Sequence, residues 1–159
     1  MKDPAVNVHP GQAGHLVEFT HDGTTEWIAF RQPALAEACR EAIQRRIDDP
    51  QPVTVAAFAD MFIELHVLVK VSGAAPTYLR YLRDISLHFD DRLLDTITKE
   101  DILHYMGDMR ARGMSDGVIG SRRAVMSSMF NTAKKWRYIK LNPCSGVGAI
   151  LPASDFAAR

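Results

Sequence analysis

Apolar side chains recur at every third or fourth position between residues 54 and 137, which is the spacing of one helix face. This pattern predicts four helices, at about residues 54–70, 76–89, 98–113 and 115–137. The fourth is the longest, and its predicted inward positions are Ile119, Met126, Met129, Phe130, Ala133 and Trp136. Amphipathic helices with short connections bury their apolar faces against one another, so the sequence predicts a mainly α fold built on a four-helix bundle.

Polar residues at the predicted helix ends agree with these boundaries. Thr98 lies three residues before Asp101, which is a variant of the capping box that satisfies backbone N–H groups at a helix start. Ser115 and Asp116 are residue types favoured at the N-terminal cap of the fourth helix. Gly113 is expected to end the third helix.

The first fifty residues follow a different pattern. Two β-prone runs, at residues 15–20 and 25–30, flank the pair Asp22-Gly23, which readily supplies the positive φ angles of a tight turn. Pro33 can open a helix at its first turn, and an apolar stripe continues that helix for about four turns. The sequence therefore predicts a small unit made of a β-hairpin and a helix.

These patterns divide the chain into segments. Residues 1–14 show no periodicity and are predicted to form a loose tail, although a third strand could lie within the sequence PAVNV. The acidic, proline-rich residues 48–53 exclude regular helix and are predicted to form a flexible joint. The predicted domains are an N-terminal unit at residues 1–50, a helical domain at residues 54–147, and the start of a linker to a further domain at residues 148–159.

Composition is that of an ordinary soluble protein, with 47% hydrophobic and 24% charged residues. The longest apolar-rich run is interrupted by charged residues, so we expect no membrane span. The N-terminus has no apolar signal-peptide core, and Cys39 and Cys144 are far apart in sequence. We therefore expect reduced thiols in a cytoplasmic protein, with a disulfide as the less favoured alternative.

The formal net charge is zero, but the basic residues are unevenly distributed. Residues 115–143 contain six basic side chains and one acidic side chain, a local charge of +5. Arg123, Ser127, Asn131 and Lys134 recur at helical spacing and share one face, with Arg122 and Lys135 at its edges. Long basic side chains with small polar ones between them suit contact with phosphates and groove edges.

Two further groups of residues extend this candidate surface. Thr77, Arg80 and Arg83 form a shorter row on the second helix, and Arg137 follows the fourth. The alternative for each row is a solvated helix face, with Arg80 paired to Asp84 across one turn. Charge spacing alone favours the solvated face. The candidate residues for contact with a polyanion such as DNA are Thr77, Arg80, Arg83, Arg122, Arg123, Ser127, Asn131, Lys134, Lys135 and Arg137.

Other chemistry is not supported by residue spacing. His66, His88 and His104 fall on three different predicted helices, without a carboxylate or thiol at metal-ligand spacing. The sequence SGAAPT lacks the lysine-serine/threonine ending of a phosphate loop, and no nucleophile and base can be paired. We expect no metal site, no cofactor and no catalytic residue.

The order of the helical motifs resembles the core-binding domain of the tyrosine recombinases, the phage integrase family. PTYLRYLRDISLHF at residues 76–89 is followed by LDTIT-x-x-DI at residues 94–102. Gly113 with Ser115 resembles the family's break before its long fourth helix. FNTAKKWRYIKLNP at residues 130–143 resembles the family's closing pattern of phenylalanine, alanine, a basic pair, an aromatic, isoleucine and Asn-Pro.

The resemblance covers roughly residues 53–147 and implies a SAM-like helical domain. In the family this domain arches over one side of duplex DNA, with its second and fourth helices approaching the major groove. It implies double-stranded DNA and other recombinase protomers as partners, and a role in DNA integration and recombination of a mobile element. Gly117 and Gly120 depart from the family's pattern and weaken the start of the fourth helix by about 1 kcal/mol each.

The family's catalytic arginines, its histidine-rich motif and its nucleophilic tyrosine have no counterpart in this sequence. We therefore expect a DNA-binding fragment that is not an enzyme by itself. The alternative is a helical protein-interaction module with no DNA role, in which exposed Trp136, Tyr138 and Ile139 bind a partner. The N-terminal unit resembles the small arm-type DNA-binding domain of some integrases; alternatively, it is a hairpin that packs on the bundle.

Overall fold

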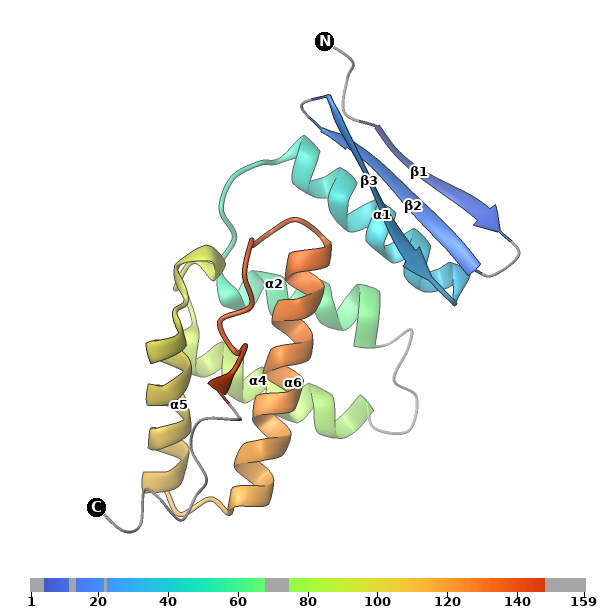
Figure 1. The fold of residues 1–159 in the computed structure, drawn as a ribbon. Helices are drawn as coiled ribbons and strands as arrows, with labels where there is room; N and C mark the ends of the chain where they lie inside the picture. The colour runs from blue at the N-terminus through green and yellow to red at the C-terminus, as the bar shows by residue number, and fades with distance from the viewer. Residues whose placement is uncertain (1–4, 12–13, 22, 68–74, 148–159) are drawn as a thin grey trace.

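The computed structural model describes residues 5–11, 14–21, 23–67 and 75–147. Figure 1 shows a three-stranded sheet with helix α1 against one of its faces, and the remaining helices grouped into a bundle beside this unit. The expected architecture, a mainly helical fold preceded by a small β-containing unit, is confirmed.

The sheet is antiparallel, with strands β1 (Ala5–Gly11), β2 (Gly14–His21) and β3 (Thr24–Phe30) in the order β1-β2-β3. The predicted hairpin is β2 and β3. The prediction of a loose tail is wrong for β1, which pairs with β2 along its whole length, and the alternative of a third strand within the sequence PAVNV is confirmed. Pro10 and Gly11 obscure this strand in the sequence, but an edge strand tolerates a proline because one row of its N–H groups has no ladder partner.

Helix α1 (Pro33–Asp48) begins with a proline in its first turn, as predicted. It covers the sheet face that carries Val6, Val17 and Phe19, all of which are buried. On the helix side, Cys39, Ala42 and Ile43 have no exposed surface. Part of this apolar face packs on the sheet and part contacts the bundle, so α1 connects the two.

The four predicted bundle helices are present. The first is α2 (Val55–Phe62), which continues as the π-helical turn η1 (Ile63–Val67); its predicted last residues, 68–70, lie outside the described part of the chain. The others are α4 (Ala75–Phe89), α5 (Lys99–Ala111) and α6 (Asp116–Lys135), and a short 3-10 turn, η2 (Leu94–Thr96), precedes α5.

The predicted caps position these helices. The Thr98 hydroxyl accepts a hydrogen bond from the backbone N–H of Asp101, and the Asp101 carboxylate accepts one from the backbone N–H of Thr98, which completes a capping box. Ser115 accepts from the N–H of Val118 at 3.3 Å at the start of α6. Gly113 has a φ of 82° between the two helices, a conformation that favours glycine.

The N-terminal unit and the bundle share one apolar core. The ring of Phe58 on α2 lies 5.7 Å from that of Trp136 and 5.3 Å from that of Tyr138. The Tyr138 hydroxyl donates a hydrogen bond to the carbonyl of Ala42 on α1 at 3.2 Å. Trp136 and Tyr138 are only 3% and 7% exposed, so the expectation that they form an exposed protein-binding surface is wrong. Their rings instead join α1, α2 and the end of α6.

Residues 48–53 have hydrogen bonds at both ends. Arg46 Nη1 donates to the carbonyls of Pro50 at 2.6 Å and Gln51 at 2.7 Å. The carbonyl of Val53 accepts from the N–H of Leu94 at 2.8 Å, beside the bridge between Thr54 and Leu93. The flexible joint and the domain boundaries stay predictions, and any motion there has to break these contacts.

Candidate nucleic-acid interface

The polar face of α6 forms one side of a hollow in the surface. The hollow has a volume of about 430 Å³, and η1 contributes one residue to it, His66. Its lining residues are His66, Arg123, Ala124, Ser127, Ser128, Asn131, Thr132 and Lys135. Four of the predicted site residues, Arg123, Ser127, Asn131 and Lys135, are therefore brought together, and the α6 residues among the lining all come from successive turns of one helix.

The charge of this surface is positive. Arg123, Lys134 and Lys135 have no carboxylate at ion-pair distance among the described residues. Lys134 is exposed on the same helix just outside the hollow. The Nζ of Lys135 lies 5.8 Å from the ring centre of Phe30 on β3. Cations without an acidic partner attract a polyanion such as a nucleic acid.

Residues 136–147 follow α6 and run back alongside that helix (Figure 1), and we call them the return segment. Asn142, which is 8% exposed, donates from its side-chain amide to Ser127 Oγ at 3.2 Å and to Asn131 Oδ1 at 2.9 Å. Its own Oδ1 accepts from the N–H of Cys144 at 2.8 Å. Asn142 therefore connects two predicted site residues to the return segment, a role that the sequence did not reveal.

Arg122 is placed differently from its neighbour Arg123, which is half-buried and lines the hollow. Its guanidinium forms an ion pair with Asp84 on α4, and the Tyr105 hydroxyl donates to the same carboxylate. The Arg122 side chain is 11% exposed and also lies over the ring of Tyr81, 5.0 Å from its centre. The alternative drawn from the sequence, a pair between Asp84 and Arg80, is not what the structure shows, because Asp84 pairs with Arg122. This network joins α4, α5 and α6.

The surroundings of Tyr105 change the pKa of its hydroxyl. Burial, reinforced by its hydrogen bond to Asp84, raises the pKa of the Tyr105 hydroxyl well above its ordinary value, while Arg122 opposes the shift. The hydroxyl therefore remains protonated at neutral pH and acts as a hydrogen-bond donor.

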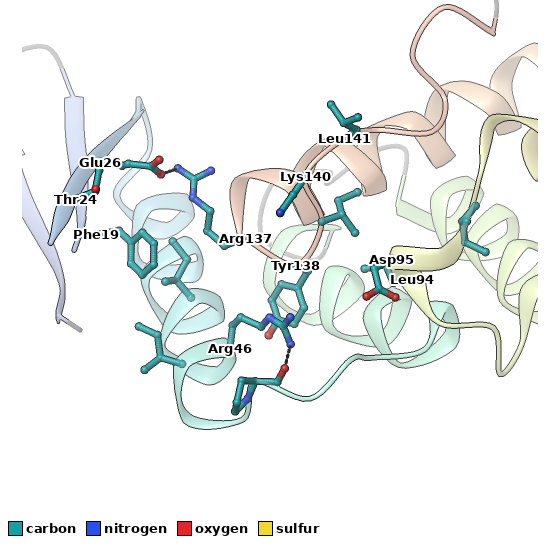
Figure 2. Close-up of a pocket in the computed structure, with 15 residues that line it drawn as sticks. Phe19, Thr24, Glu26, Arg46, Leu94, Asp95, Arg137, Tyr138, Lys140 and Leu141 are labelled. Atoms are coloured by element: carbon teal, nitrogen blue, oxygen red, sulfur yellow. Dashed lines mark hydrogen bonds and ion pairs between the residues drawn. The ribbon is translucent and has the colours of Figure 1, made fainter. Parts of the chain in front are cut away.

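Arg137 ends α6 in an unusual backbone conformation. Its φ is 68°, and the N–H groups of Arg137 and Tyr138 donate to the carbonyls of Lys134 and Ala133, which is a Schellman motif with arginine where glycine is usual. The guanidinium of Arg137 pairs with Glu26 on β3. Figure 2 shows this side chain extended from the end of α6 toward the sheet.

Arg137 and Glu26 are also part of the lining of a larger cavity, of about 1200 Å³, between the N-terminal unit and the bundle. Figure 2 shows Arg46, Asp95 and Lys140 around it together with apolar side chains. Carboxylates are part of its lining, so this cavity suits a polyanion less well than the hollow on α6.

The row predicted on α4 is separate from the hollow. Thr77, Arg80 and Arg83 are exposed but do not line it. The guanidinium of Arg80 lies 5.3 Å from the ring centre of Tyr81. These three residues remain predicted DNA contacts on a second helix.

Both cysteines are buried and unpaired. Burial raises the pKa of the Cys39 thiol to about 12, against the opposing effect of Arg137 and Lys135. Burial also raises the pKa of Cys144 to about 12, against the opposing effect of Arg123. Neither thiol is a reactive nucleophile in the folded protein.

The described residues provide neither a metal site nor a membrane-spanning helix. Within residues 5–11, 14–21, 23–67 and 75–147, no three histidine, cysteine or acidic side chains come close enough to hold a metal ion. In that same part of the chain, no helix has both the length and the apolar character needed to cross a membrane.

One solved structure supports the fold. The crystal structure of a lambda integrase dimer bound to a COC′ core site matches this chain with a TM-score of 0.57 at 18% sequence identity. The match covers 96% of this chain and 47% of the integrase chain, so this chain spans about half the length of that protein. At this identity the likeness shows the fold alone. No family model and no curated protein matches the sequence.

Proposed function

We propose that this chain is a DNA-binding fragment of a site-specific tyrosine recombinase. In this proposal residues 54–147 are its core-binding domain, which clamps one side of duplex DNA at the recombination core site. The observation that carries the proposal is the hollow on α6, where Arg123 and Lys135 line the surface together with Asn131 and have no carboxylate at ion-pair distance among the described residues. The fold likeness to a DNA-bound integrase supports the same proposal.

In this proposal the cations on and after α6 have different roles. Arg123 and Lys134 are placed to contact phosphates, and Ser127 and Asn131 lie between them, where a base edge would come close. Arg122 serves the packing of α4 against α6, because Asp84 already neutralises it. Arg137 holds the sheet against the end of α6, because Glu26 neutralises it.

The N-terminal unit is the weaker candidate for binding DNA. Residues 1–50 contain five basic and eight acidic side chains, a net charge of −3. A negative unit is repelled by phosphates. We assign it a supporting role, in which α1 buttresses α2 and the end of α6.

The decisive experiment measures how binding of a labelled duplex depends on salt. Each phosphate contact that is removed lowers the slope of log K against log salt by about 0.9 for duplex DNA. The Arg123→Ala/Lys134→Ala double variant should therefore lower the slope by about 2 and weaken binding to all sequences. Its free energy of unfolding should change by less than about 0.5 kcal/mol, because both positions lie outside the apolar core.

The matched control removes two cations that lie elsewhere, in Arg40→Ala/Lys99→Ala. Arg40 is on α1 and Lys99 is at the start of α5, and neither lines the hollow. The control should keep the slope of the parent chain. Equal slopes for all three proteins would make the polar face of α6 a solvated helix face that does not contact DNA. Binding that does not respond to salt would refute the proposed DNA-binding function itself.

A further inference from the structure

We infer that Asn131 reads DNA as a hydrogen-bond donor only, because Asn142 fixes the orientation of its side-chain amide. This inference rests on the proposed function and goes beyond it by naming the base chemistry that α6 selects. It follows from a chain of hydrogen bonds in which each orientation determines the next.

The first orientation is that of Asn142. The N–H of Cys144 points at the side chain of Asn142, with 2.8 Å between the two heavy atoms. A backbone N–H can only donate, so the Asn142 atom that faces it has to be the oxygen. Asn142 is 8% exposed, so water is not readily available to replace this bond. The NH₂ group of Asn142 consequently faces α6.

The second orientation is that of Asn131. The NH₂ of Asn142 meets three acceptors, namely the Ser127 carbonyl at 3.1 Å, Ser127 Oγ at 3.2 Å and Asn131 Oδ1 at 2.9 Å. An NH₂ group cannot accept, so the Asn131 amide has to present its oxygen to Asn142. The NH₂ of Asn131 is then turned away from Asn142, on an exposed residue that lines the hollow.

This orientation has a consequence for base recognition. The usual partner of asparagine in the major groove is adenine, which needs the side chain to donate to N7 and to accept from N6 at the same time. The Asn131 oxygen is turned toward Asn142, so the side chain cannot present its oxygen and its NH₂ group to one adenine at the same time, although that oxygen keeps a second lone pair. The group that it presents away from Asn142 is the NH₂ donor, which suits the N7 and O6 acceptors of guanine or the O4 of thymine.

The first test uses the free protein and needs no DNA. In NMR spectra, the side-chain NH₂ protons of Asn142 should exchange slowly with water and those of Asn131 rapidly. The Asn142 signals should stay protected in Asn131→Asp, which keeps an oxygen toward Asn142, and lose protection in Asn131→Ala. Slow exchange at Asn131 with fast exchange at Asn142 would overturn the orientation, whatever the protein binds.

The second test selects from a pool of duplexes with randomised central base pairs, followed by sequencing of the bound fraction. The parent should enrich guanine or thymine at one position. Asn131→Asp replaces the outward donor with an acceptor and should shift that position toward cytosine or adenine, by at least about fivefold, the lower end for a good base contact. Asn142→Ala releases the Asn131 amide and should admit adenine there. If Asn142→Ala fails to fold, Asn131→Asp still decides the result.

The control for the added charge is Ser128→Asp, which places a carboxylate in the same hollow. It should lower affinity for every duplex without moving the preference at that position. The outcomes separate the two claims. If no duplex binds in a salt-dependent manner, the proposed function fails and this inference fails with it. If duplexes bind but Asn131→Asp keeps the parent's base preference, or the parent itself prefers adenine, this inference alone is overturned.

Discussion

Two adjacent arginines on α6 should respond in opposite ways to the same substitution. Arg122→Ala is expected to destabilise the fold and to leave the salt dependence of DNA binding unchanged. Arg123→Ala is expected to leave the fold unchanged and to lower that salt dependence. The difference arises because Arg122 pairs with Asp84, whereas Arg123 faces the hollow without a carboxylate partner among the described residues.

The magnitude for Arg122→Ala follows from its surroundings. Removing one partner of a fully buried ion pair costs about 3–5 kcal/mol. Here Arg122 is 11% exposed and Asp84 is 28% exposed, so water and Tyr105 can solvate the remaining carboxylate. The Nε of Arg122 is buried without a hydrogen-bond partner in the described structure, which further lowers the stabilisation that the ion pair contributes. We expect a loss of about 2 kcal/mol, or roughly 4–8 °C in Tm for a chain of this size.

The assay combines urea unfolding with duplex titrations at several salt concentrations, corrected for the folded fraction. Arg123→Ala should change the free energy of unfolding by less than about 0.5 kcal/mol and lower the slope of log K against log salt by about 0.9. The double variant Asp84→Ala/Arg122→Ala should be less destabilised than the sum of its single variants. If Arg122→Ala left the free energy of unfolding unchanged and lowered the slope, Arg122 would contact a phosphate of the DNA. The reasoning that its ion pair with Asp84 stabilises the fold would then be refuted.

Three further predictions concern the rest of the molecule. Arg46→Ala should speed amide hydrogen exchange at Asp49 and Gln51, because the carbonyls of Pro50 and Gln51 lose the cation that holds them. The pKa of the Asp101 carboxyl is held well below its usual range by Arg92 and by the cap, so its stabilisation is complete above about pH 4 and lost as the pH falls below that value; Asp101→Asn should flatten this decline in acid unfolding curves. Burial raises the pKa of Cys39 and Cys144 to about 12, so a thiol reagent at about pH 8 should modify both only after unfolding.

The sequence predicted the fold well where local signals agree with each other. The cap at Thr98, the break at Gly113 and the inward face of α6 all depend on residues within one or two turns, and the structure confirms them. Strand β1 was predicted only as an alternative, within the sequence PAVNV, because Pro10 and Gly11 are weak strand formers and only pairing with β2 makes that segment regular. The strand conformation of β1 therefore depends on its tertiary pairing with β2 and not on local sequence signals.

The candidate site was predictable only in part for the same reason. Helical spacing placed Arg123, Ser127 and Asn131 on one face, and that grouping is present in the hollow. Spacing could not show that Arg122 meets Asp84, 38 positions earlier, or that Arg137 meets Glu26, 111 positions earlier. In the sequence, Asn142 was only part of the closing Asn-Pro pair, because its hydrogen bonds to α6 depend on the path of the return segment.

The return segment is held at two points that belong to different parts of the molecule. The Tyr138 hydroxyl reaches the carbonyl of Ala42 on α1, and the Asn142 amide reaches Asn131 on α6. One inserted residue lengthens an extended chain by about 3.3–3.6 Å, which is enough to break a hydrogen bond at one of these points. Natural variants that keep this arrangement should therefore vary in side chain at residues 139–141, where Leu141 is 79% exposed, but not in length. An alignment of such variants should therefore show no gap between the positions of Tyr138 and Asn142.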